Sequence, residues 1–131
     1  MRCLIVEDNE LLREGLRFFL DRHAEIEIAV NGREAVQRFG DALTARNPFD
    51  LVLLDIVMPE MDGQQALKLM RQAEKESGQE AQRKAVIIMT TALHSPETME
   101  EALWDGDCTD YLVKPVARAD LMAMLSRYGL L

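Results

Sequence analysis

The sequence contains few of the residues whose abundance marks particular protein classes. Only 2 of its 131 residues are cysteine, 4 are proline and 7 are glycine. So few cysteines argue against a small disulfide-held scaffold, and the low proline and glycine content argues against a fibrous or disordered chain. The cysteines Cys3 and Cys108 lack C-x-x-C spacing and the histidines His23 and His94 stand alone, so the sequence offers no zinc pattern.

Basic residues and long apolar runs are also scarce. The chain has 15 lysines and arginines against 23 acidic residues, which gives a formal net charge of −8, and it has no basic cluster. Because a nucleic-acid backbone or an anionic membrane needs a basic patch, we expect neither as a direct partner. No apolar run approaches the ~20 residues of a membrane span, and the opening MRCLIVEDNE does not form a signal peptide. Cys3 lies within an apolar run and is read as a reduced thiol, which favours a cytoplasmic protein.

What the sequence does contain is a regular series of short apolar runs. They predict strands at 3–6, 26–30, 51–55, 85–89 and 111–113. All but the second are continuously apolar runs, which is typical of strands covered by helices on both faces. Glu27 lies in the middle of the second run, so we expect that strand at an edge of the sheet.

Helical patterns fill the intervals between these runs. The spacing of apolar residues predicts helices over 9–22, over 33–46, from Asp62, from Ser95 and from Leu121 to Tyr128. Five strand–helix units in a chain of this length predict one doubly wound α/β domain with a parallel sheet, and they leave no room for a second domain. The charged stretch 71–84 is interpreted as the end of the third helix and a solvated loop.

Polar side chains gather where the predicted strands end. They are Glu7 and Asp8 after the first strand, Asp55 at the end of the third, Thr90 and Thr91 after the fourth, and Lys114 after the fifth. In open α/β sheets this edge is where ligands bind. A lone acid at such a place is usually a helix cap and a lone lysine a surface charge, but carboxylates, hydroxyls and an ammonium together suit Mg²⁺ and a phosphoryl group.

A carboxylate is the nucleophile that remains once the common motifs are excluded. The sequence has no G-x-x-x-x-G-K-[ST] loop, no G-x-G-x-x-G fingerprint and no G-x-S-x-G elbow. Aspartyl phosphates are known enzyme intermediates. Asp55 ends the central apolar strand, where packing would orient it best, so we predict that Asp55 is the reacting group.

Four segments are distinctive in combination, and they follow one another in the order LIVEDNE, DLVLLDIVMPEMDG, VIIMTTA and DYLVKP. Through them the sequence resembles the receiver domains of two-component response regulators over nearly its whole length. The resemblance implies a flavodoxin-like sheet with strand order 2-1-3-4-5 and a single receiver domain over residues 1–131 without an output domain. It also implies a stand-alone regulator that accepts a phosphoryl group from a histidine kinase or phosphotransfer protein. The regulator would then dock an unidentified protein through its fourth helix, fifth strand and fifth helix, and a homodimer through the same surface stays open.

The resemblance also assigns roles to individual residues. Asp55 would be the phospho-acceptor, Lys114 would pair with a phosphoryl oxygen, and Thr91 and Tyr111 would form the switch. Mg²⁺ would be held by Asp8, Asp55 and the backbone carbonyl of Val57, with Glu7 acting through a metal-bound water. The Lys114–Pro115 bond would be cis. Trp104 falls on the docking surface, where a partner anchor and a packing residue are both open readings.

The sequence departs from the family pattern in two places and is ambiguous in a third. The acidic pair is Glu7-Asp8 where many members have two aspartates, and Asp107 stands where the family usually has glycine, which predicts an altered turn. Thr90 is a second hydroxyl beside Thr91. Adjacent strand residues point to opposite sides, so only one of the two can face the acceptor, and the Ala92 that follows favours Thr91.

Two apolar residues suggest a long-lived phosphoryl group. Val57 and Leu93 match positions that flank the path of hydrolytic water in the family, and neither can orient water. We therefore expect the protein to catalyse its own phosphorylation and a slow dephosphorylation, without turnover of an external substrate. The alternatives are a degenerate receiver that binds partners without phosphorylation, and a haloacid-dehalogenase-like phosphatase. The latter needs an acid at position 57, where this chain has valine.

Overall fold

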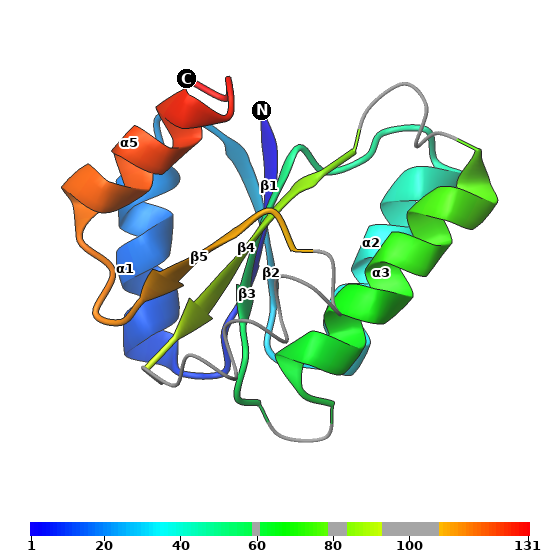
Figure 1. The fold of residues 1–131 in the computed structure, drawn as a ribbon, viewed down its shortest axis with the longest axis horizontal. Coiled ribbons are helices and arrows are strands. Elements are labelled where there is room, and N and C mark those ends of the chain that lie inside the picture. The colour runs from blue at the N-terminus through cyan, green and yellow to red at the C-terminus, as the bar shows by residue number, and fades with distance from the viewer. Residues whose placement is uncertain (59–60, 79–83, 93–107) are drawn as a thin grey trace.

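The computed structural model describes residues 1–58, 61–78, 84–92 and 108–131, and within them strands and helices alternate (Figure 1). The strands are β1 (Arg2–Val6), β2 (Glu25–Ala29), β3 (Leu51–Asp55), β4 (Val86–Thr91) and β5 (Asp110–Val113). The helices are α1 (Glu10–Leu20), α2 (Gly32–Thr44), α3 (Gly63–Ser77) and α5 (Arg118–Arg127). The helix predicted from Ser95 lies outside the described residues, as do Leu93, Trp104 and Asp107.

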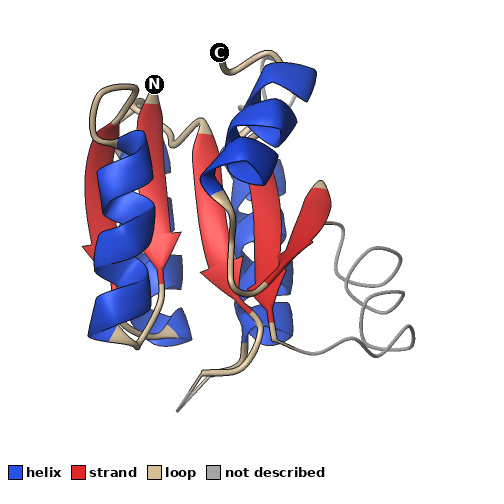
Figure 2. Ribbon diagram, turned by 90° about the vertical axis from the view of Figure 1, so that its left-hand side faces the viewer, coloured by secondary structure: helices blue, strands red, loops and turns tan. Residues whose placement is uncertain are grey.

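The strands form one parallel sheet in the order β2-β1-β3-β4-β5. Helices α1 and α5 cover one face of this sheet, and α2 and α3 cover the other (Figures 1 and 2). The predicted doubly wound, flavodoxin-like fold is therefore confirmed. The prediction that the second strand lies at an edge is also confirmed.

Side-chain alternation along β3 divides the interior into two cores. Leu51 and Leu53 pack with residues of α1 and α5, whereas Val52 and Leu54 pack with residues of α2 and α3. All four are at most 1% exposed, as a central strand covered on both faces requires. The Cys3 thiol is a free thiol buried in the first core, as predicted, and its burial raises its pKa strongly, so it is unreactive.

Polar side chains fix where three helices begin. Asn9, Asn31 and Asp62 each accept a hydrogen bond from the backbone N–H three residues later, at 3.0, 2.8 and 2.8 Å. Such caps satisfy donors that the first helical turn leaves unpaired. The helix predicted from Asp62 is thus confirmed, with Asp62 as its cap. Among the helices in the described ranges, none has the length and apolarity that crossing a bilayer requires.

The charged stretch 71–84 does contain the end of α3, as predicted, but the interpretation that it has no role beyond solvation is wrong for its first turn. Glu74 is only 3% exposed, and its carboxylate accepts hydrogen bonds from Arg71 at 2.8 Å and from the backbone N–H of Ala85 at 2.8 Å. Arg71 also donates to the Ala85 carbonyl and to Thr109 Oγ1. The two charges are buried because each satisfies the other, and together they tie α3 to the start of β4.

Candidate functional site

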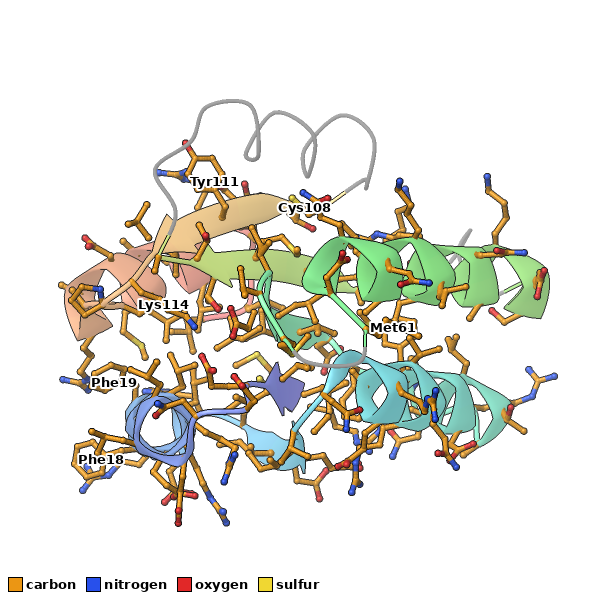
Figure 3. The ribbon with its side chains drawn as sticks, turned by 90° about the horizontal axis from the view of Figure 1, so that it is seen from below. Phe18, Phe19, Met61, Cys108, Tyr111 and Lys114 are labelled. Atoms are coloured by element: carbon orange, nitrogen blue, oxygen red, sulfur yellow. The ribbon has the colours of Figure 1, made fainter. Side chains whose placement is uncertain are left out.

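The carboxyl ends of the strands bring the predicted site residues to one edge of the sheet. Glu7 and Asp8 directly follow β1, Asp55 is the last residue of β3, and Lys114 directly follows β5. Strands β1 and β3 are neighbours in the sheet, and β4 alone separates β3 from β5, so these residues lie near one another. Figure 3 looks onto this edge, with Lys114 beside it.

Three carboxylates meet there. Glu7, Asp8 and Asp55 each offer an oxygen, and these oxygens all lie within 4.8 Å of one another. Glu7 is 1% exposed and Asp55 is 4% exposed, whereas Asp8 is open to solvent. Carboxylates at this spacing repel unless a cation lies between them. The predicted convergence of the three acids is therefore present in the structure.

Lys114 supplies one positive charge to this group. Its Nζ lies 2.7 Å from Glu7 Oε1 and 3.1 Å from Asp55 Oδ1. Partial burial by itself lowers the pKa of Lys114, but the Glu7 and Asp55 carboxylates outweigh it and raise the pKa above its usual value. The ammonium group is therefore charged at physiological pH.

The charge balance of the site is incomplete. Three carboxylates face one ammonium group, which leaves a net charge of −2. Within the described residues, the ion pair with Lys114 is the one polar contact of the buried Glu7 Oε1. An all-oxygen donor set with excess negative charge and one solvent-open member suits a hard cation that keeps several waters, so these residues fit Mg²⁺.

Two backbone N–H groups and the Arg13 side chain hold the acidic segments in place, and sequence reasoning did not single out these donors. The Asn9 N–H donates to Glu7 Oε2 at 3.2 Å, Arg13 donates to the Glu7 carbonyl at 3.1 Å, and the Val57 N–H donates to Asp55 Oδ1 at 3.3 Å. The Asn9 side chain caps α1 as well. An asparagine between an acidic pair and a helical pattern is a readable cap signal, so Asn9 was predictable.

The two hydroxyls at the end of β4 lie on opposite faces of the sheet. The strand register pairs Asp55 with Thr90, and Thr90 lines a pocket of about 130 Å³ together with Glu7 and Lys114. Thr91 follows one residue later, and its carbonyl accepts a hydrogen bond from the Lys114 N–H at 2.7 Å. Both threonines are 1% exposed. The strand pleat thus favours Thr90 as the neighbour of Asp55, and the assignment to Thr91 depends on the family resemblance.

The register also relates Thr91 to Tyr111. Met89 pairs with Tyr111 across β4 and β5, and Thr91 lies two residues beyond Met89, on the same face of the sheet. Tyr111 is partly buried against the core of α2 and α3. The two predicted switch residues therefore share one face, and Figure 3 shows the Tyr111 side chain well away from Lys114. The Lys114–Pro115 bond is cis, as predicted.

The surroundings of the site are partly apolar. Val57 is 63% exposed, and on α1 Leu11 is 82% exposed. Phe19 of α1 points toward the Lys114 segment, whereas Phe18 points away from the sheet (Figure 3). The site is thus a small charged cavity with apolar side chains at its border.

Comparison with known proteins agrees with this arrangement. A family model described as the response regulator receiver domain matches residues 3–126. The chain belongs to the response regulator receiver family. It is a receiver domain of the kind found in two-component and phosphorelay systems.

The chain is similar to a segment of longer curated proteins. The chain is 33% identical to the signal transduction histidine-protein kinase BarA of Escherichia coli over 129 residues, which are 98% of this chain but 13% of BarA. Across the curated relatives it matches, the chain spans from 4% to 55% of their length.

Solved structures are similar over nearly the whole chain. One is the receiver domain of Ssk1 in complex with the phosphotransfer protein Ypd1, from Saccharomyces cerevisiae, with 32% identity, a TM-score of 0.82 and coverage of 98% of this chain and 88% of that one. Another is a CheX–CheY complex with beryllofluoride and Mg²⁺ from Borrelia burgdorferi, with 28% identity, a TM-score of 0.81 and coverage of 98% and 89%.

Proposed function

We propose that this receiver accepts a phosphoryl group on Asp55, from a histidine kinase or a phosphotransfer protein, in a reaction that requires Mg²⁺. The observation that carries the proposal is the group of three carboxylate oxygens within 4.8 Å, with the Lys114 ammonium 3.1 Å from one of them. The solved complexes of a related receiver with Ypd1 and of a related CheY with Mg²⁺ support the same donor class and the same ion.

Each residue of the site has its own role in the proposed transfer. Asp8, Asp55 and the Val57 carbonyl would hold Mg²⁺, with Glu7 acting through a bound water. The ion would offset the negative charge that spreads over the equatorial phosphoryl oxygens. An Asp55 oxygen attacks phosphorus, the P–N bond to the donor histidine breaks, and the imidazole keeps the electron pair. Lys114, already charged and 3.1 Å from Asp55 Oδ1, pairs with a phosphoryl oxygen.

Phosphorylation would be transmitted to a partner through residues of β4 and β5. Thr91 forms a hydrogen bond to the new phosphoryl group, and Tyr111, on the same face of the sheet, follows it inward. One such bond contributes about 0.5–1.5 kcal/mol, which biases a two-state element without forcing it. The surface that includes β5 and α5 would then bind a protein partner.

Beryllofluoride, which mimics an aspartyl phosphate, tests the proposal without a cognate donor. Isothermal titration should show one equivalent bound to the wild type in the presence of Mg²⁺ and none in the presence of EDTA. Asp55→Asn should abolish binding, and the exposed Asp41→Asn on α2 should leave it unchanged. Binding to neither the wild type nor the control would instead favour a degenerate receiver.

The exposed Val57 makes the lifetime of the phosphoryl group a separate prediction. Its apolar side chain, 63% exposed beside Asp55, cannot orient a hydrolytic water. Val57→Asn should therefore speed the decay of the aspartyl phosphate, measured after labelling with a small phosphodonor and removal of the donor. The matched change Leu69→Asn, on the surface of α3, should leave the decay rate unchanged. This control separates a local effect at the site from a general loss of stability. Equal rates for Val57→Asn and the wild type would contradict the hypothesis.

A further inference from the structure

Gly63, the first residue of α3, lies against the backbone of the acceptor itself. A Cβ placed on Gly63 would come within 2.2 Å of the Asp55 carbonyl oxygen, 2.9 Å of the Asp55 carbonyl carbon and 2.8 Å of the Ile56 Cα. These are backbone atoms of a central strand, so they cannot turn aside as a flexible side chain does. The positive-φ glycines in the described residues are Gly78 and Gly129, so Gly63 is required for close approach and not for its own backbone conformation.

Hydrogen bonds on both sides hold the segment after Asp55. On one side, the Ile56 N–H donates to the Thr90 carbonyl of β4 at 3.1 Å. On the other side, the Gly63 N–H donates to the Ile56 carbonyl at 2.8 Å, a bond that needs the close approach that a side chain would prevent. Residues 55–57 are therefore fixed between β4 and the first turn of α3.

Gly32 provides a comparison within the same part of the fold. A Cβ on Gly32, at the start of α2, would meet the Met61 carbonyl oxygen at 2.6 Å and the Met61 Cβ at 3.0 Å. This contact is also tight, but it falls on the loop before α3 and not on the acceptor strand. Gly40, inside α2, would meet nothing within 4 Å. The chain thus contains a glycine against the acceptor, a glycine against the neighbouring loop and a glycine in open space.

We propose that Gly63 is a positioning residue for phosphoryl transfer: because it has no side chain, α3 rests directly on the backbone of Asp55 and fixes the acceptor relative to Asp8 and Lys114. This inference rests on the proposed phosphorylation of Asp55. An added methyl group would displace residues 55–57 by roughly 1 Å, and a shift of that size between reacting groups slows a reaction by about 100-fold. The same shift would weaken Mg²⁺ binding, since partners that orient metal ligands affect affinity by about 10- to 100-fold.

The test compares Gly63→Ala, Gly32→Ala and Gly40→Ala with the wild type. Each protein is measured for melting temperature, for Mg²⁺ affinity by isothermal titration, and for the rate of labelling by acetyl phosphate as a function of donor concentration. Gly63→Ala should bind Mg²⁺ about tenfold or more weakly and reach a maximal labelling rate about 10- to 100-fold lower. Gly32→Ala should lower the melting temperature but keep both other values within about twofold of the wild type, and Gly40→Ala should keep all three or raise the melting temperature.

The outcomes separate this inference from the proposed function. If the wild type is labelled and Gly63→Ala has a lower melting temperature with unchanged Mg²⁺ affinity and labelling rate, Gly63 has a packing role only and the inference is wrong. If the wild type is not labelled by acetyl phosphate, by the cognate donor or by beryllofluoride, the proposed function fails, while the effect of Gly63→Ala on Mg²⁺ affinity still tests the positioning role.

A measurement on the wild type keeps the inference testable if Gly63→Ala does not fold. The Gly63 amide belongs to the first turn of a helix, where amides normally exchange with solvent quickly. Because it donates to the Ile56 carbonyl, it should be protected to within about tenfold of the β3 amides in hydrogen exchange followed by NMR. Exchange as fast as that of the Glu10 amide, in the first turn of α1, would overturn the inference.

Discussion

Two clusters of buried charge lie at opposite ends of β4, and they are built differently. The cluster of Arg71, Glu74 and Thr109 lies at the start of the strand, where Arg71 and Glu74 bind Ala85, and the acidic site of Glu7, Asp8, Asp55 and Lys114 lies at the end where the parallel strands finish. In the first, one carboxylate faces one guanidinium, and both Glu74 oxygens accept hydrogen bonds of 2.8 Å. In the second, among the residues that the structure describes, three carboxylates face one ammonium group, and the ion pair with Lys114 is the one polar contact of the buried Glu7 Oε1.

The difference separates a cluster whose charges are balanced from one whose charges are not. A buried ion pair that satisfies all its partners stabilises one arrangement and has no capacity for another ligand. A buried group with excess charge is unfavourable by itself, and it becomes favourable when a cation and an anion bind together. The acidic site is thus incomplete as a structural feature and suited to Mg²⁺ and a phosphoryl group.

The largest predicted difference concerns the same substitution in the two clusters. Glu74→Gln should destabilise the protein by about 3 kcal/mol, because it leaves the buried Arg71 without its counter-ion. Glu7→Gln should leave the free energy of unfolding unchanged or raise it, because it removes one of three repelling charges. Urea unfolding in EDTA measures both values. Equal losses of stability would mean that the acidic site is a structural ion-pair cluster like the other.

Bound Mg²⁺ should offset the excess negative charge of the acidic site and so raise the stability of the folded protein. At a concentration 100 times its dissociation constant, Mg²⁺ should raise the free energy of unfolding of the wild type by about 2.7 kcal/mol. The gain should disappear in Asp55→Asn. It should persist in Arg71→Lys, which keeps a positive charge beside Glu74 far from the site. Stabilisation of Asp55→Asn by the same amount would place the ion elsewhere.

Alanine substitutions of the two threonines at the end of β4 test which hydroxyl contacts the ligand of the acidic site. Thr91→Ala should weaken beryllofluoride binding by about 2- to 13-fold, which corresponds to one hydrogen bond of 0.5–1.5 kcal/mol. Thr90→Ala is the matched control and should change binding less than twofold. The reverse result would show that the strand pleat, which pairs Thr90 with Asp55, decides the contact, and that the family resemblance misassigns it.

The smallest effect is the response to alkaline pH. The pKa of Lys114 is raised, so its contribution to stability is present below about 10.5 and is lost only as the pH rises through the folded-state value. The Cys3 thiol and the Tyr128 hydroxyl also have raised pKa values, and they stay protonated in the folded protein at pH values where the unfolded chain ionises. All three groups therefore reduce stability only above about pH 9.

Unfolding measured from pH 6 to 11 checks this pH dependence. The wild type should be insensitive to Lys114 titration between pH 6 and 9, and the decline above pH 9 should become shallower in Cys3→Val. A decline near pH 7 that disappears in Lys114→Met would contradict the raised pKa of the lysine.

Much of this fold was predictable because each strand is a local apolar run. Strand β3 was predicted with its exact bounds, since four apolar residues and then an acid mark both its burial and its end. Helix α1 is shorter than predicted, ending at Leu20 and not at residue 22, because His23 and Ala24 donate to the Leu20 carbonyl in a closing turn. Strand β4 runs two residues past its predicted end, because Thr90 and Thr91 pair with β5.

The features that could not be predicted depend on contacts between distant parts of the chain. Glu74 lies in a stretch that looks solvated, and only the positions of Arg71 and Ala85 show why it is buried. Gly63 is an ordinary helix start by sequence, and only the structure explains the glycine, because a Cβ added there would lie 2.2 Å from the Asp55 carbonyl oxygen. The acids at the strand ends were predictable because parallel strands end at one edge, which is a property of the topology.

Mass spectrometry of the intact protein is the most direct test of the proposal that Asp55 takes up the phosphoryl group. After incubation with acetyl phosphate and Mg²⁺, the wild type and Asp41→Asn should each gain the mass of one phosphoryl group. Asp55→Asn, and the wild type in EDTA, should gain none. No gain in the wild type, or an equal gain in Asp55→Asn, would contradict the account.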